Sequence, residues 1–161
     1  MNQSAVFGLL GPSGLEDSFA AYLFDKYGYW PLPSTNKIST PGYEFVMLDK
    51  LDGGTIGLQA KNGKTRIPIE TYEKDIQDGA YKETWLVTTG GTVTRNGKPI
   101  LSDGRKVQIA RLFRADNILR IEYSDLTEFQ NWVLSKDNQN YLSPIVRNYV
   151  SWCSSDKQEP K

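Results

Sequence analysis

The sequence predicts a single small α/β domain. Residues 14–27 carry apolar side chains at helical spacing, residues 55–61 alternate as a strand with two distinct faces, and residues 85–89 form a short apolar run typical of a strand covered on both sides. A chain of 161 residues, 39% of them apolar, has the size and composition of one domain with a packed core. We assign residues 1–153 to this domain and expect the polar tail, residues 154–161, to be disordered.

The first half of the chain is expected to alternate helices with strands. Pro12-Ser13-Gly14 precedes the first helix and Gly28 follows it as a stop signal. A second, weaker helical pattern over residues 68–81 has an acidic face. We expect a helix at 14–27, a loop at 31–42, a strand at 43–48, a turn at 52–54, a strand at 55–61 and a helix at 68–81.

The second half is expected to be rich in strands. The turn signals Arg95-Asn96-Gly97-Lys98 and Asp103-Gly104 predict a small β-meander with basic tips over residues 91–112. We expect a last strand from residue 118. A helix should then begin near residue 124, with Ser124 and Asp125 as N-cap candidates, and another near residue 143, with Pro144 in its first turn.

The composition excludes several kinds of site. The chain has no histidine and a single cysteine, Cys153, which excludes catalytic triads, His- or Cys-ligated zinc and an internal disulfide. A metal site would use carboxylate, carbonyl and water oxygens, the ligands that Mg²⁺, Mn²⁺ and Ca²⁺ prefer. No apolar run approaches the roughly 20 residues that span a bilayer, and no signal peptide is recognisable, so we expect a cytoplasmic protein without membrane contact.

Charge is unevenly distributed along a chain whose net charge is zero. Residues 95–120 contain seven Arg and Lys against two Asp, whereas acidic residues gather at 16–25 and 70–78. Neutrality argues against a bulk binder of polyanions, but a basic segment beside an acidic site suits a phosphate and a metal ion. Ordinary solvated surfaces would give the same pattern.

Gln59 and Lys61 are the centre of the candidate catalytic site. They lie two positions apart on the strand expected at 55–61, so both side chains project from the same face. In the hydrolysis of a phosphodiester, Gln59 can offer a carbonyl oxygen to a metal ion, and Lys61 can supply a positive charge near the attacking water or the phosphate. Glu16 on the preceding helix and Glu44 on the preceding strand place acids before this pair.

This order of elements and residues resembles the PD-(D/E)XK superfamily, the restriction-endonuclease-like nucleases, in its variant with glutamine in place of the last acid. The resemblance covers roughly residues 13–90 and includes residues 84–90, which look like the strand that follows the catalytic strands in Mrr-like members. It implies a restriction-endonuclease-like α/β/α core with a mixed central sheet, here with an additional β-meander.

The same resemblance implies an Mg²⁺- or Mn²⁺-dependent DNA endonuclease. Glu16, Glu44 and Gln59 would then be the metal ligands, and Lys61 would complete the catalytic set. The chain is also similar in size to the small intron-encoded homing endonuclease of this superfamily, while restriction and repair nucleases would present nearly the same features.

DNA contact is expected from basic residues that follow the second strand or lie at the meander tips. A two-stranded ribbon fits the major groove, where arginine can read guanine and lysine can neutralise phosphate. A solubilising hairpin tip is the alternative. The expected DNA-binding residues are Lys64, Arg66, Arg95, Lys98, Arg105 and Lys106. Because one site per chain must pair to cut both strands, we expect a homodimer or a higher homo-oligomer.

Each catalytic candidate has a structural alternative. Glu16, with Asp17, could complement a helix dipole in the first turn. Gln59 and Lys61 could be polar residues on a solvated or edge strand. Glu44 departs from the Asp usual in the superfamily, and Asp49 or Asp52 could serve in its place, although Asp49 is expected on the opposite strand face and Asp52 reads as a turn residue.

Two rival functions also fit this sequence. A binding or assembly module that has lost the chemistry would keep the same fold, and Glu44 and the neutral net charge favour it. A small-molecule enzyme is disfavoured because the sequence has no glycine-rich phosphate loop and no nucleophile elbow.

Four aromatic residues are expected in the core or at a subunit interface: Trp132, Tyr141, Tyr149 and Trp152.

Overall fold

The computed structural model describes residues 3–32 and 45–148, except 143 and 145. Glu44, Tyr149, Trp152, Cys153 and the tail at 154–161 therefore lie outside the described residues. The elements in chain order are α1 (Gln3–Tyr27), β1 (Tyr29–Pro31), β2 (Phe45–Asp49), β3 (Thr55–Lys61), β4 (Arg66–Pro68), α2 (Ile69–Gln77), β5 (Glu83–Thr88), β6 (Thr92–Arg95), β7 (Lys98–Pro99), β8 (Leu101–Ser102), β9 (Arg105–Lys106), β10 (Ile109–Ala115), β11 (Ile118–Ser124), α3 (Thr127–Leu134) and the 3₁₀ helix η1 (Lys136–Tyr141). None of the helices in this part of the chain is long and apolar enough to cross a membrane.

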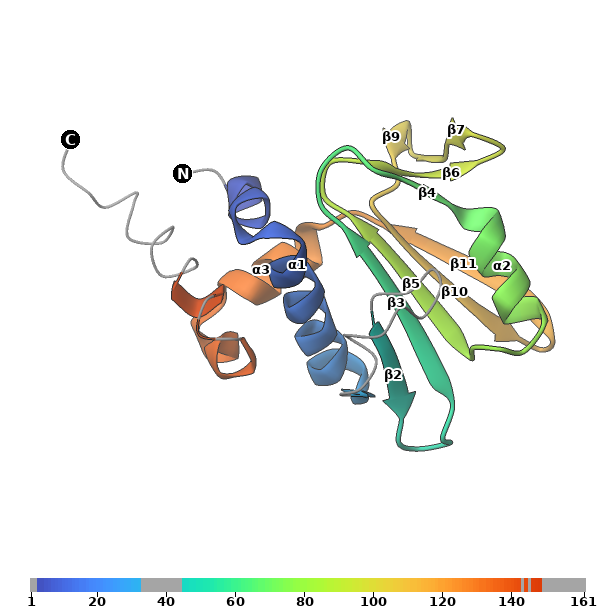
Figure 1. Cartoon of the computed structure of the whole chain (residues 1–161), viewed down its shortest axis with the longest axis horizontal. Coiled ribbons are helices and arrows are strands. Elements are labelled where there is room, and N and C mark those ends of the chain that lie inside the picture. The colour runs from blue at the N-terminus through green and yellow to red at the C-terminus, as the bar shows by residue number, and fades with distance from the viewer. Residues whose placement is uncertain (1–2, 33–44, 143, 145, 149–161) are drawn as a thin grey trace.

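A six-stranded mixed sheet organises the molecule, with strand order β1-β2-β3-β5-β10-β11 (Figure 1). Strands β3 and β5 pair in parallel, with Gln59 opposite Leu86, and the other neighbours in this sheet are antiparallel. Helix α2 lies in the crossover between β3 and β5, as parallel neighbours require. The predicted α/β class with a mixed sheet is confirmed.

Helices cover the two faces of the sheet with separate apolar cores (Figure 1). Helices α1 and α3 pack on the face formed by Ile56, Leu58 and Ala60 of β3, where Phe19 lies 4.8 Å from the ring of Phe129. Helix α2 covers the opposite face with the expected apolar stripe, in which Ile69, Tyr72 and Ile76 are all buried. Trp132 lies in the first core, as predicted.

Helix α1 is longer than the sequence indicated. It begins at Gln3 and includes the Pro-Ser-Gly tripeptide that was expected to precede it. Proline at position 12 removes one helical N–H, but the helix continues through it. Gly28 ends the helix as predicted, with a φ of 74°. Glu16 therefore lies in the middle of α1, so the first-turn dipole role considered for it is wrong.

Strand β10 is the main element that the sequence pattern missed. The meander expected over residues 91–112 is confirmed as hairpins up to β9, but Ile109 begins a central strand between β5 and β11. Arg111 and Arg114 interrupt the apolar alternation of this strand, which hid it. The turn at Asp116 and Asn117, with φ of 54° and 64°, joins β10 to β11 as a two-residue hairpin.

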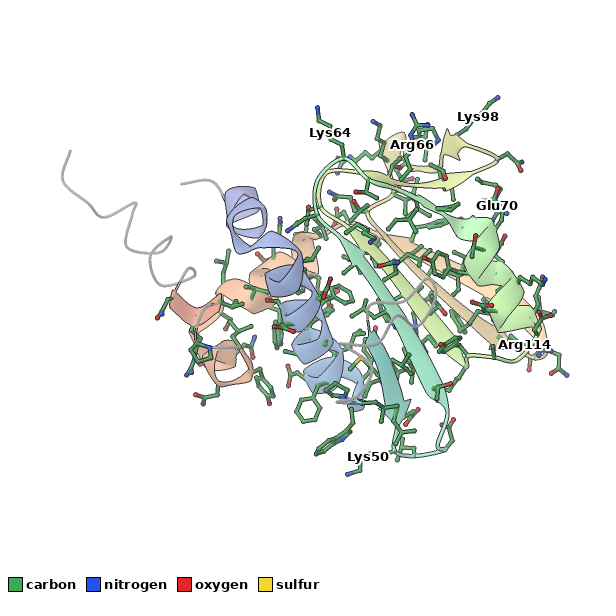
Figure 2. All side chains as sticks on the ribbon, viewed as in Figure 1. Lys50, Lys64, Arg66, Glu70, Lys98 and Arg114 are labelled. Carbon is green, nitrogen blue, oxygen red and sulfur yellow. The ribbon has the colours of Figure 1, made fainter. Side chains whose placement is uncertain are left out.

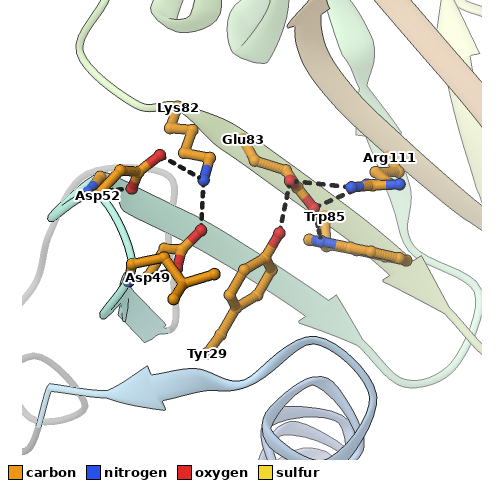
Figure 3. A network of polar contacts seen from close by, with 9 residues as sticks. Tyr29, Asp49, Asp52, Lys82, Glu83, Trp85 and Arg111 are labelled. Carbon is orange, nitrogen blue, oxygen red and sulfur yellow. Dashed lines mark hydrogen bonds and ion pairs between the residues drawn. The ribbon is translucent and has the colours of Figure 1, made fainter.

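Arg111 can lie inside the sheet because Glu83 on β5 neutralises it (Figure 3). The Glu83 side chain is 2% exposed and accepts hydrogen bonds from Tyr29 Oη at 2.8 Å, Trp85 Nε1 at 2.6 Å and Arg111 Nε at 2.8 Å. The Arg111 guanidinium also lies 5.1 Å from the centre of the Tyr27 ring. Burial, followed by the charge of Glu83, raises the pKa of Tyr29 and keeps its hydroxyl protonated as a donor.

We expect Arg111→Met to lower the free energy of unfolding by about 3 kcal/mol, because the change leaves the Glu83 carboxylate buried without its cation. Urea unfolding followed by tryptophan fluorescence measures the loss. Arg114→Met is the matched control, since Arg114 is an exposed arginine on the same strand. Equal losses for the two variants would contradict the role given to Arg111.

Candidate nucleic-acid interface

The carboxyl ends of the parallel strands β3 and β5 lie at the same end of the sheet, where α/β proteins commonly bind ligands. The loops that leave these strands are bonded to each other. Thr89 N donates to Lys61 O at 3.2 Å, Thr89 Oγ1 donates to Asn62 Oδ1 at 2.6 Å, and Thr92 N donates to Thr65 O at 3.1 Å. These bonds continue the parallel pairing beyond β3 and β5 into β4 and β6, and so fix the shape of this end of the molecule.

Glycine allows the two loops to approach so closely. A Cβ atom at Gly91 would lie 1.8 Å from the carbonyl oxygen of Thr65, and one at Gly90 would lie 3.1 Å from that of Gly63. No side chain fits at Gly91 without moving the backbone of the facing loop. The sequence did not predict this close approach, although a glycine pair soon after a buried strand is a signal for it.

The end of the molecule beyond these loops carries a group of exposed cations, which we call the basic end. Figure 2 shows Lys64, Arg66 and Lys98 together there, on the loop after β3, on β4 and on β7. Hairpin β8–β9 adds Arg105 and Lys106. Within the described part of the chain, none of these five side chains forms an ion pair. Two carboxylates lie beside these five cations, Asp103 in the turn of the same hairpin and Asp125, whose pKa the charge of Arg105 helps to lower, so this end has a net positive charge.

Arg95, the predicted base-reading residue, is paired with a carboxylate of α2. Its guanidinium forms two hydrogen bonds of 2.9 Å with the carboxylate of Glu73 on α2, which raises the pKa of Arg95. The next residue, Asn96, donates its backbone N–H to Glu70 Oε2 at 2.6 Å. The acidic face expected for this helix therefore anchors the hairpin β6–β7, and Arg95 positions the hairpin while Lys98 stays exposed at its tip.

A hollow of about 340 Å³ separates the basic end from helix α3. Its walls include Thr89 after β5, Arg105 and Lys106 on β9, and Gln130 on α3. At the start of α3 the Asp125 carboxylate accepts the Thr127 N–H at 3.0 Å, and this bond lowers the pKa of Asp125. The N-cap of α3 is Leu126, which makes no side-chain cap hydrogen bond, so the N-cap expected at Ser124 or Asp125 is wrong by one or two residues.

The structure divides the four predicted catalytic residues. Gln59 and Lys61 project from the same face of β3, and Lys61 lies at its carboxyl end. Gln59 is 8% exposed and its Nε2 donates to Tyr72 Oη at 3.3 Å on α2, so it is not on a solvated face. Glu16 belongs to α1, which packs on the opposite face of the sheet. Glu44 lies outside the described residues; Phe45, the residue after it, pairs with Leu58.

The described donors do not complete the expected metal site. Among the described residues, no group of three or more Cys, Asp or Glu side chains is placed to hold a metal ion. The two alternatives to Glu44 are bound elsewhere, because Lys82 Nζ forms an ion pair with Asp49 and donates to Asp52 Oδ2 at 2.8 Å (Figure 3). Asp52 also accepts the Gly54 N–H at 2.8 Å, which confirms it as a turn residue.

We expect Gly91→Ala to lower the free energy of unfolding by about 3 kcal/mol, because its Cβ would overlap the Thr65 carbonyl and separate the two loops. Gly90→Ala is the matched comparison and should cost less, since its nearest backbone atom is at 3.1 Å. Chemical denaturation of both variants tests this order. A Gly91→Ala protein as stable as the parent would disprove the close approach of the loops.

The Lys82 ion pairs predict a pH dependence of stability. Hydrogen bonds from Lys82 lower the pKa of Asp49 and of Asp52 below the ordinary 3.8, so the stabilisation exists above that pH and is lost as the pH falls through the lowered values. Lys82→Met should therefore be less stable than the parent at neutral pH, and the difference should shrink as the pH falls below about 4. Urea unfolding across this range measures it, with exposed Lys74→Met as the control. A pH-independent difference would contradict the assignment.

Comparison of the chain with protein-family models, curated proteins and solved structures found no match.

Proposed function

We propose that this protein binds double-stranded DNA through the basic end. The observation that carries the proposal is that Lys64, Arg66, Lys98, Arg105 and Lys106 are exposed at one end of the molecule without ion-pair partners among the described residues. Cations in this arrangement match the regular negative charge of a duplex, whose phosphates provide most of the affinity of such complexes.

The backbone of the basic end suits a duplex as well. Hairpin β6–β7 turns at Asn96 and Gly97, and a two-stranded ribbon has the width of the major groove. Glu70 and Glu73 of α2 hold this hairpin in place, so little ordering is needed when it binds. The zero net charge does not oppose the proposal, because a neutral protein with segregated charges still presents a positive field at one end.

A second candidate function is hydrolysis of the bound DNA. It is favoured by the position of Lys61, whose strand ends at the edge that carries the basic end, and by Gln59 on the same strand face. A bound Mg²⁺ would neutralise the scissile phosphate and activate water. Two of the expected ligands do not fit a shared metal shell. Glu16 belongs to α1, on the opposite face of the sheet, and the Gln59 side chain donates a hydrogen bond to Tyr72. We therefore derive no catalytic step through a metal ion.

Duplex binding can be measured by fluorescence anisotropy across a salt series. The triple variant Lys64→Ala/Arg66→Ala/Lys98→Ala should bind more weakly, and the slope of log K against log salt should fall by about 0.9 for each phosphate that the protein no longer neutralises. Replacement of exposed cations elsewhere, in Lys50→Ala/Lys74→Ala/Arg114→Ala, is the matched control and should leave affinity and slope nearly unchanged. Equal losses in both triples, or no binding by the parent, would refute the basic end as the interface.

Cleavage is tested separately on supercoiled DNA with Mg²⁺, with Mn²⁺ and with EDTA. Metal-dependent nicking that is abolished in Lys61→Ala, with duplex affinity retained, would support the nuclease. Binding without nicking under every metal condition would leave a binding module and reject the nuclease. Glu44→Gln in the same assay tests the predicted ligand that the described residues do not include.

A further inference from the structure

The two edges of the central sheet differ sharply. Strand β1 at one edge has three residues and ends in Pro31, features that hinder pairing with another strand. Strand β11 at the other edge has seven residues, no proline, and an unbroken register with β10 from Ile118 to Ser124. It therefore presents a long, regular edge without proline or a bulge, and its charged side chains are those of Arg120 and Glu122.

The backbone groups that β11 offers can be identified from its hairpin. The two-residue turn with φ of 54° and 64° is type I′, which closes on the hydrogen-bonded pair Ala115 and Ile118. Hydrogen-bonded and non-hydrogen-bonded pairs then alternate along the ladder. Leu119, Ile121 and Tyr123 consequently direct their N–H and C=O groups away from β10, towards the side on which the described residues form no further strand.

The sequence of β11 is complementary to itself in one antiparallel register. A two-fold axis at Ile121 places Leu119 opposite Tyr123 of the partner subunit, and Arg120 opposite Glu122 of the partner subunit. The apolar pairs fall on the face covered by α2, and the two Arg–Glu pairs fall on the other face. A two-fold axis at Arg120 or Glu122 would instead place like charges together and would centre on a residue whose backbone faces β10.

We infer that β11 is the site at which a second copy of this chain binds, by antiparallel β11–β11 pairing centred on Ile121. The backbone groups of Leu119, Ile121 and Tyr123 would bond reciprocally across the axis, joining two six-stranded sheets into one. Ile118, an apolar side chain 55% exposed at the start of this strand, would gain cover opposite Ser124 of the partner subunit. Glu122 Oε1 accepts Arg111 Nη1 at 3.1 Å, which leaves Oε2 for Arg120 of the partner subunit.

Charge reversal tests both the partner and the register. Arg120→Glu should weaken dimerisation about tenfold or more, because two attractive pairs become repulsive, and Glu122→Arg should do the same. An equimolar mixture of the two variants should dimerise again, since each like-charged strand then meets its opposite. Sedimentation velocity across the micromolar range measures the three samples and the parent, and Arg114→Glu is the control on the neighbouring strand.

Circular dichroism checks that each variant is folded. A parent chain that stays monomeric, single variants that dimerise as the parent does, or a mixture no tighter than its components would each overturn the inference. If Glu122→Arg disturbs Arg111 and unfolds, a second measurement replaces it: in a Cys153→Ser background, a mixture of Arg120→Cys and Glu122→Cys should form an intermolecular disulfide on oxidation, whereas Arg114→Cys with Glu122→Cys should not. Failure of the first mixture to cross-link would also overturn it.

Discussion

Parallel pairing of β3 with β5 is the constraint on which the rest of the structure depends. Parallel neighbours need a crossover, which α2 provides, and they end at the same edge of the sheet. The loops after the two strands are therefore forced together, and Gly91 is the residue that permits their close approach. The same parallel pairing continues as β4 with β6. Hairpin β6–β7, which carries Lys98, extends from this pair, and hairpin β8–β9, which carries Arg105, follows it in the chain.

Ion pairing then decides which cations remain for a ligand. The basic stretch at 95–120 is dispersed in the fold, because Arg111 neutralises buried Glu83 and Arg95 is held by Glu73. The basic end is assembled instead from positions far apart in sequence, with Lys64 and Arg66 joining the hairpin cations. Charge along a sequence and charge on a surface are thus different quantities, and the surface is the one that phosphate would meet.

Elements whose signals are local could be predicted from the sequence. The alternation of β3, the buried run of β5, and the turns at Asn96-Gly97 and Asp103-Gly104 depend on neighbouring residues alone. Strand β10 was missed because its central arginine is explained only by Glu83, 28 positions earlier. The shared face of Gln59 and Lys61 follows from strand geometry, but the location of Glu16 depends on which face of the sheet α1 covers. A tertiary choice of that kind leaves no local signal.

The direction of β11 determines where the two basic ends would lie in a dimer formed through this strand. Strand β11 runs the same way as β3 and β5, because two antiparallel steps separate it from β5. Antiparallel pairing about Ile121 would therefore direct the basic ends of the two copies to opposite ends of the joined sheet. Such a dimer does not present two sites side by side to the half-sites of one short palindrome. It is suited to hold two separate duplex segments, and its apparent affinity would then depend on whether both segments lie within reach of the two ends.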